Sequence, residues 1–178
     1  MPAGWSGNLW GRTLCTTDSN GLFSCVTGDC GSGTIECTNS GAPPVTIANI
    51  TLDGASSLDY YGVSLVNGFN VPLVVIPANR IATCIGAGCS VDINAECPTV
   101  LQDIANGGET VACKSGCVAF GDPKDCCTGA YSTNTTCGPT QYSKFFKSVC
   151  PLTNTYAFDN GTFTCTESPD YTIGFCEL

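Results

Sequence analysis

The chain has 178 residues, no histidine and a formal net charge of −9, from 15 acidic and 6 basic side chains. This length suits one medium-sized domain. The negative charge makes nucleic acids and anionic membrane surfaces poor partners, because both require a basic surface. Without histidine, serine triads and histidine-based metal sites are excluded, and acid–base chemistry near neutral pH is left to carboxylates or a perturbed lysine.

The 15 cysteines exceed the ~8% of residues that marks a disulfide scaffold. Zinc is the alternative, but no pair of Cys-x-x-Cys knuckles occurs, so we expect no metal and no cofactor. Disulfides imply an oxidising compartment, which predicts a secreted or vacuolar protein without a membrane span. Residues 1–5 show no signal peptide, and a missing upstream segment would reconcile this with the cysteine content.

The first half of the chain predicts strands on both sides of a turn-rich excursion. An edge strand is expected at 5–12, followed at 13–43 by a small excursion stapled by cysteines and rich in glycine. The β-branched stretch 45–52 predicts a strand in which alternate side chains face opposite ways. Two more strands, at 60–66 and 71–76, are joined by a turn at Asn67–Gly68. Pro72 and Pro77 indicate that the second of these has an open side or irregular ends.

Residues 91–150 predict a disulfide-rich subdomain with short helices. One helix is expected at 99–104, with Val100, Leu101 and Ile104 on its inner face. A second is expected at 140–149, capped by Thr140. Strand character then returns at 155–158, 162–165 and 171–176. The sequence therefore predicts a mainly β, antiparallel sandwich in one domain, 1–178, with sandwich strands in 1–12, 44–90 and 151–178.

Four stretches resemble the thaumatin-like family (pathogenesis-related group 5). They are Gly21-x-Phe23-x-Cys25-x-Thr27-Gly-Asp-Cys30, Gly68-Phe-Asn-Val-Pro72, Cys126-Cys-Thr-Gly129 and Cys137-Gly-Pro-Thr-x-Tyr-Ser-Lys-Phe-Phe-Lys147. The resemblance extends from Trp5 to Cys176 and implies a thaumatin-like sandwich in a secreted, defence-type protein, plausibly of plant origin. It also implies a disulfide pairing: Cys15–Cys25, Cys30–Cys37, Cys84–Cys165, Cys89–Cys150, Cys97–Cys113, Cys117–Cys126 and Cys127–Cys137.

Cys176 is left unpaired by this pairing. Relatives carry its partner in an N-terminal strand, so the resemblance implies that this chain is N-terminally truncated. We expect a monomer that is prone to aggregation or dimerisation, because the missing strands would expose a sheet edge and an apolar face.

Some relatives are reported to bind or weakly cleave β-1,3-glucans in a cleft lined by an arginine, a glutamate and three aspartates. By resemblance these five positions fall here on Asn8, Asn49, Gly62, Asn67 and Asp159, the last being open between 159 and 160. Only the last keeps a carboxylate. Asparagine can hydrogen-bond a sugar but cannot act as acid, base or nucleophile, so no glycosidase activity is predicted.

The expected function is therefore that of a non-enzymatic defence-type protein that binds fungal cell-wall β-glucan or another protein. The alternatives are a weak endo-β-1,3-glucanase that uses Asp159 and a degenerate or truncated form without activity. Three N-glycosylation sequons begin at Asn49, Asn134 and Asn160, and two of them coincide with the presumed cleft. Asp29, in a glycine-rich turn, is expected to accept hydrogen bonds from nearby backbone amides.

Overall fold

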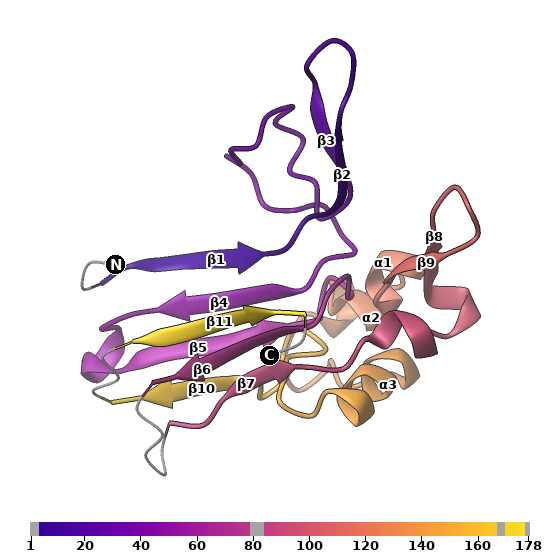
Figure 1. Ribbon diagram of the computed structural model, residues 1–178. Coiled ribbons are helices and arrows are strands. Elements are labelled where there is room, and N and C mark those ends of the chain that lie inside the picture. Colours follow the sequence, from indigo (N-terminus) through magenta and orange to yellow (C-terminus); the bar gives the residue numbers. More distant parts are fainter. Residues whose placement is uncertain (1–3, 79–83, 167–169, 177–178) are drawn as a thin grey trace.

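The computed structural model describes residues 4–78, 84–166 and 170–176, and its centre is a sandwich of two antiparallel sheets (Figure 1). The predicted ranges 1–12, 44–90 and 151–178 also include residues 1–3, 79–83, 167–169 and 177–178, which lie outside the described residues. One sheet has the strand order β1-β4-β5-β10 and the other the order β11-β6-β7. Their bounds are β1 Ser6–Trp10, β4 Ile47–Thr51, β5 Asp59–Ser64, β6 Leu73–Pro77, β7 Ala87–Cys89, β10 Thr162–Cys165 and β11 Tyr171–Phe175.

Six predicted sandwich strands are confirmed, namely those at 5–12, 45–52, 60–66, 71–76, 162–165 and 171–176. The predicted strand at 155–158 is wrong, because this segment is a turn in which the Asp159 amide donates to the Tyr156 carbonyl. The open side expected for the strand after Asn67 is also wrong, since β6 lies between β11 and β7. Its two prolines instead stand at its ends: Pro72 precedes β6 and Pro77 is its last residue.

Alternating side chains of the two sheets form the sandwich core. Ala48, Ile50, Tyr61 and Val63 face Leu73, Val75 and Ala87 of the other sheet. Tyr61 is 1% exposed and donates its hydroxyl proton to the Ile85 carbonyl at 2.6 Å, so its polar atom stays paired inside the core. Full burial of a valine, leucine or isoleucine side chain in this core stabilises the fold by about 1.5–3 kcal/mol. The Cys84–Cys165 disulfide joins the edge of this core to β10.

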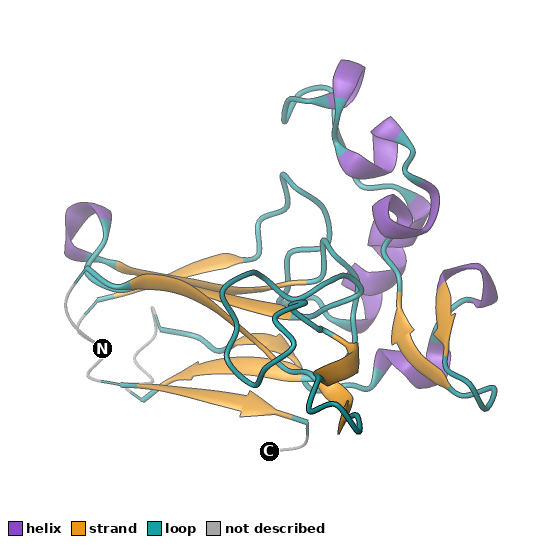
Figure 2. Cartoon of the chain, turned by 90° about the horizontal axis from the view of Figure 1, so that it is seen from above, coloured by secondary structure: helices purple, strands orange, loops and turns teal. Residues whose placement is uncertain are grey.

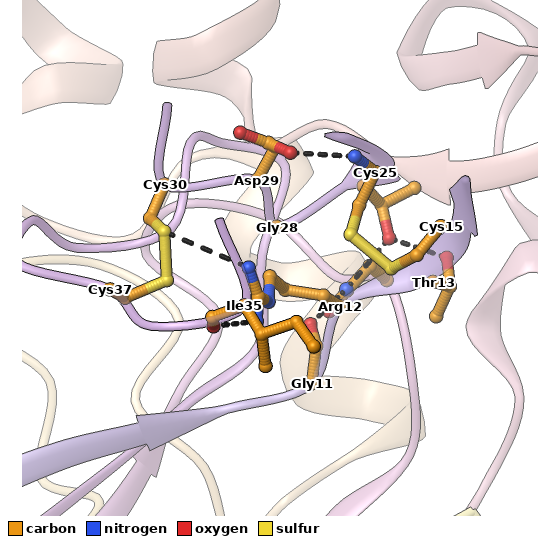
Figure 3. The surroundings of a disulfide bond; sticks show 12 residues. Gly11, Arg12, Thr13, Cys15, Cys25, Gly28, Asp29, Cys30, Ile35 and Cys37 are labelled. Atoms are coloured by element: carbon orange, nitrogen blue, oxygen red, sulfur yellow. Dashed lines mark hydrogen bonds between the residues drawn. A yellow bond between two sulfur atoms is a disulfide. The ribbon is translucent and has the colours of Figure 1, made fainter. Parts of the chain in front are cut away.

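Residues 13–43 project from the sandwich as the excursion predicted from its cysteines and glycines (Figure 1). It contains a hairpin, β2 Thr13–Thr17 and β3 Phe23–Thr27, that sequence reasoning did not place. Asp29 accepts hydrogen bonds from the amide of Cys25 (Figure 3) and from that of Gly31, both at 2.6 Å, as expected. These two hydrogen bonds, Gly31 first, hold the pKa of Asp29 below its ordinary value.

Arg12 connects this excursion to the sandwich. Its guanidinium lies over the Phe23 ring, 4.9 Å from the centroid, and donates to the Thr34 carbonyl. It also donates to the Ile35 carbonyl (Figure 3). It also lies against the Cys30–Cys37 disulfide, with 3.8 Å between the nitrogen and the Cys30 sulfur. One basic side chain therefore connects the end of β1 to the two loops that are closed by the Cys15–Cys25 and Cys30–Cys37 disulfides.

The helices gather at one end of the sandwich, apart from the single turn Ala55–Ser57 (Figure 2). This end contains α1 Gly116–Phe120, α2 Pro123–Cys126, α3 Gln141–Val149, the hairpin β8 Gln102–Ile104 and β9 Thr110–Cys113, and the single turns Ile93–Glu96, Thr99–Leu101 and Gly129–Tyr131. The predicted helix at 140–149 is confirmed as α3. Thr140 stands at its N-terminal cap position, but its hydroxyl donates to Asp125 at 2.5 Å and does not cap the helix.

The predicted helix at 99–104 is wrong. A single 3₁₀ turn, Thr99–Leu101, is followed directly by β8, and only Leu101 of the three expected inner-face residues is buried. Val100 and Ile104 are 62% and 57% exposed. The apolar spacing is typical of a helix, but in this segment the apolar side chains at 100 and 104 face solvent.

Seven disulfides hold these parts together, in the same pairs that the family resemblance implies. Two of them, Cys89–Cys150 and Cys97–Cys113, lie in a second core with Leu65, Phe69 and Phe146. Cys176 is exposed and has no disulfide partner among the described residues.

Candidate functional site

The outward face of the four-stranded sheet contains a polar, uncharged area next to an apolar pair, Trp10 and Ile47. Its strand register places side chains in two rows across β1, β4, β5 and β10: Ser6, Thr51, Tyr60 and Thr164, and then Asn8, Asn49, Gly62 and Thr162. We call these eight residues the polar face. None of them can ionise near neutral pH, in a chain whose net charge is −9. The face can therefore offer hydrogen bonds but no charge to a ligand.

Three of the five predicted site residues come together on this face. Asn8 lies opposite Asn49, and Asn49 lies opposite Gly62. The asparagine side chains are both exposed. Asn67 lies outside the sheet, in the turn after β5, where its carbonyl accepts a hydrogen bond from the Val45 amide. Asp159 lies in the loop before β10 and turns toward the helical end of the molecule.

There is no room for a side chain at Gly62. A Cβ atom built on it would lie 2.7 Å from the carbonyl oxygen of Gly161, which is a backbone atom and cannot swing away. Gly161 is itself held in place, because its amide donates to the Asn154 side chain at 2.7 Å. The position to which the resemblance assigns an aspartate is thus closed by the neighbouring loop as well as lacking a carboxylate.

Asp159, the carboxylate that remains, is fully engaged within the protein. Lys147 Nζ lies 3.1 Å from both of its oxygens. The amide and hydroxyl of Thr155 donate to one oxygen, both at 2.9 Å, and the Asn160 amide donates to the other at 2.8 Å. The side chain is 11% exposed. These donors fill the ~4 lone-pair positions of a carboxylate and leave little capacity for a substrate.

The electrostatics of Asp159 follow from these contacts. Burial raises the pKa of its carboxyl, but the hydrogen bonds from Thr155, Lys147 and Asn160 outweigh that effect, so the pKa lies below its ordinary value. A glycosidase general acid needs a raised pKa, so that it is protonated at working pH. Asp159 is shifted in the opposite direction and stays ionised.

Two pockets lie away from the polar face, one of about 490 Å³ against β6 and β7 and one of about 300 Å³ beside Cys176. Among the described residues, no group of three or more cysteine, aspartate or glutamate side chains could hold a metal ion. No helix in the described ranges is long and apolar enough to cross a membrane.

Sequence reasoning missed most of the polar face. Strand alternation places Thr51 on the same side as Asn49, but the sequence does not single out Ser6, Tyr60, Thr162 or Thr164, although each belongs to a predicted strand. Strand alternation could have assigned each to a face of its own strand. It could not have shown the register of the strands, which brings these residues together on one surface.

Comparisons with known proteins agree on one family. The family model described as "Thaumatin family" matches residues 1–177. Thaumatin-like protein 1b of Malus domestica is 49% identical over 98% of this chain and 84% of its own length. A protein of Prunus avium named glucan endo-1,3-beta-glucosidase is 46% identical over 98% of this chain and 74% of its own length. The PR5-like receptor kinase of Arabidopsis thaliana is 49% identical over 99% of this chain, which corresponds to 28% of the kinase. With the antiparallel sandwich and the disulfide-stapled segments already described, these matches show that the chain belongs to the thaumatin family.

Proposed function

We propose that this chain is a non-enzymatic, secreted or vacuolar defence-type protein that binds a neutral cell-wall polysaccharide, a β-1,3-glucan, over its polar face. The observation that carries the proposal is the chemistry of that face. Its side chains provide amides, hydroxyls and one phenol, which match the hydroxyl groups of an uncharged sugar chain. A negatively charged polymer would gain nothing from these groups and would be repelled by the net charge of the protein.

The lack of enzymatic activity is supported by the state of the carboxylates. Glycoside hydrolysis usually needs two carboxyl groups on either side of the bond that breaks, ~5–9.5 Å apart according to the stereochemical outcome. None of the eight polar-face residues is acidic, and Asp159 is occupied by Lys147 and Thr155. A glucanase would therefore require this ion pair to open and a second acid to come from elsewhere.

The glucanase remains the second candidate because the Prunus avium relative is named glucan endo-1,3-beta-glucosidase. Its acid would be Asp159. Reducing-sugar release from laminarin that is lost in Asp159→Asn, at a temperature where the variant remains folded, would favour this candidate and refute the non-enzymatic proposal.

The direct test uses the unglycosylated chain, refolded with its disulfides and mixed with curdlan, an insoluble β-1,3-glucan. We expect retention on curdlan, weaker retention on cellulose, and no reducing sugar from laminarin. Asn49→Ala should lower retention, because it removes an exposed amide from the middle of the face. Asn134→Ala is the matched control, since it removes an equally exposed amide from a turn outside the sheet. Equal retention of the two variants would contradict binding over the polar face.

A further inference from the structure

The polar face contains a modification signal that polysaccharide binding does not explain. Asn49, Ile50 and Thr51 form an N-glycosylation sequon within β4, an inner strand of the sheet. Asn49 and Thr51 both point outward, while Ile50 is buried in the sandwich core. The Asn49 side chain is exposed and makes no hydrogen bond to another described residue. Its Nδ2 atom is therefore accessible for the attachment of a glycan.

The surroundings of Asn49 leave space for an attached sugar. On the β1 side its register partner is the exposed Asn8, whereas on the β5 side the space above Gly62 is filled by the Gly161 backbone. The open space therefore lies outward from Asn49 and toward β1. Neighbouring strands lie ~4.8 Å apart, so the four strands make a face about 15 Å across. An N-linked glycan is bulky. One that begins at Asn49 would start within the face and extend over the residues on both sides.

We propose that Asn49 is an N-glycan acceptor, and that its glycan covers the polar face so that modification and polysaccharide binding exclude each other. The exclusion rests on the proposed function, whereas the acceptor claim does not. The donor is a lipid-linked oligosaccharide diphosphate of the secretory pathway. The bond between the sugar C1 and the diphosphate breaks, a bond between C1 and Asn49 Nδ2 forms, and the displaced proton leaves with the lipid diphosphate. The seven disulfides are consistent with passage through that oxidising compartment.

The other two sequons provide internal comparisons. Asn160 is exposed, and the threonine of its sequon, Thr162, belongs to the polar face, so a glycan there would lie at the rim. Asn134 is exposed in the turn at 133–136, within the loop closed by the Cys127–Cys137 disulfide. A glycan on Asn134 would extend from a turn outside the sheet and should leave binding unchanged.

The test is production of the whole chain in a eukaryotic secretory host, with glycopeptide mass spectrometry and curdlan retention as separate measurements. Thr51→Val removes the sequon but keeps Asn49 and the shape of residue 51, and Thr51→Ser keeps both the sequon and the hydroxyl. Thr136→Val removes the Asn134 sequon outside the face. We expect a glycan on Asn49 in the wild type and in Thr51→Ser, and none in Thr51→Val. Retention by the unglycosylated refolded wild type should exceed that of the glycosylated wild type by about tenfold or more, which is 1.4 kcal/mol or more. Thr136→Val should match the wild type.

The outcomes separate the two claims. An unmodified Asn49 in a preparation that carries a glycan at Asn134 overturns the acceptor claim and leaves the proposed function standing. A wild type that is modified at Asn49 yet retained as well as the unglycosylated refolded wild type overturns the exclusion. If the unglycosylated refolded chain is not retained at all, the proposed function fails, and the glycopeptide measurement still decides whether Asn49 is an acceptor.

Discussion

Replacing Asp159 by asparagine tests whether this carboxylate serves the structure. The substitution removes the negative charge beside Lys147 and turns an amide group toward donors on one side of the side chain. A hydrogen bond to a charged group contributes ~1.5–3 kcal/mol, and an unsatisfied buried donor costs ~1–3 kcal/mol. Since Lys147 is 35% exposed, solvent screens part of the pair. We expect the free energy of unfolding to fall by about 2–3 kcal/mol at pH 7.

The pH dependence of this loss follows from the lowered pKa of Asp159. A carboxyl whose folded-state pKa lies below its unfolded value of ~3.9 contributes stability that is present above that value and is lost as the pH falls through the folded pKa. The stability difference between wild type and Asp159→Asn should therefore be constant above about pH 5 and shrink below about pH 4. The measurement is guanidinium denaturation followed by tryptophan fluorescence, with the disulfides intact.

Asp53→Asn is the matched control for this experiment. Asp53 is also an aspartate in a loop, but its exposed side chain makes no hydrogen bond to another described residue. Its replacement should change the free energy of unfolding by less than about 0.5 kcal/mol. The reasoning is refuted if Asp159→Asn is as stable as this control at pH 7, or if its deficit grows as the solution is acidified.

Two further predictions concern the sheet and the disulfides. Gly62→Asp should lower the free energy of unfolding by about 1–3 kcal/mol, because its Cβ would clash with a backbone oxygen at 2.7 Å, and should release no sugar from laminarin; a stable, active variant in thermal unfolding and reducing-sugar assays would contradict this. Removing the Cys84–Cys165 bond by a double alanine substitution should cost about 4–5 kcal/mol, since it closes a loop with a separation of 81 residues. Removing Cys117–Cys126, with a separation of 9, should cost only about 3 kcal/mol, so equal denaturation midpoints for the two double variants would count against the loop-length argument.

The sandwich could be predicted from local patterns because its strands obey a simple rule. In β4, the buried Ala48 and Ile50 alternate with the exposed Asn49, and the period of two is visible in the sequence. The 99–104 segment obeys no such rule, since Val100 and Ile104 are apolar yet exposed. Helices α1 and α2 are also too short to show a 3.6-residue period. They are set by local capping, such as the Ser115 hydroxyl that accepts from the Val118 amide.

The candidate site was only partly predictable for a different reason. The resemblance gave the identities of Asn8, Asn49 and Gly62, but their alignment in one row depends on the pairing of three separate strands. Asn8 and Asn49 are 41 residues apart and Asn49 and Gly62 are 13 apart, and alternation within a strand carries no information on such pairing. The role of Asp159 depends on Lys147, which approaches it only because α3 packs beside the loop before β10. No spacing rule in the sequence connects these two residues.

The proposed lack of catalysis rests on several separate features of the structure, so no single substitution would restore activity. An acid placed at Asn49 would supply one carboxylate, but Gly62 is closed by Gly161, and Asp159 is held in an ion pair with Lys147. A flat face without charge forms only neutral hydrogen bonds, each of which contributes a net ~0.5–1.5 kcal/mol after exchange with water. Binding to a single short sugar chain should therefore be weak. A β-1,3-glucan presents the same unit many times, so dissociation from one unit is followed by rapid rebinding to the next, and retention on an insoluble polymer should far exceed affinity for an oligosaccharide.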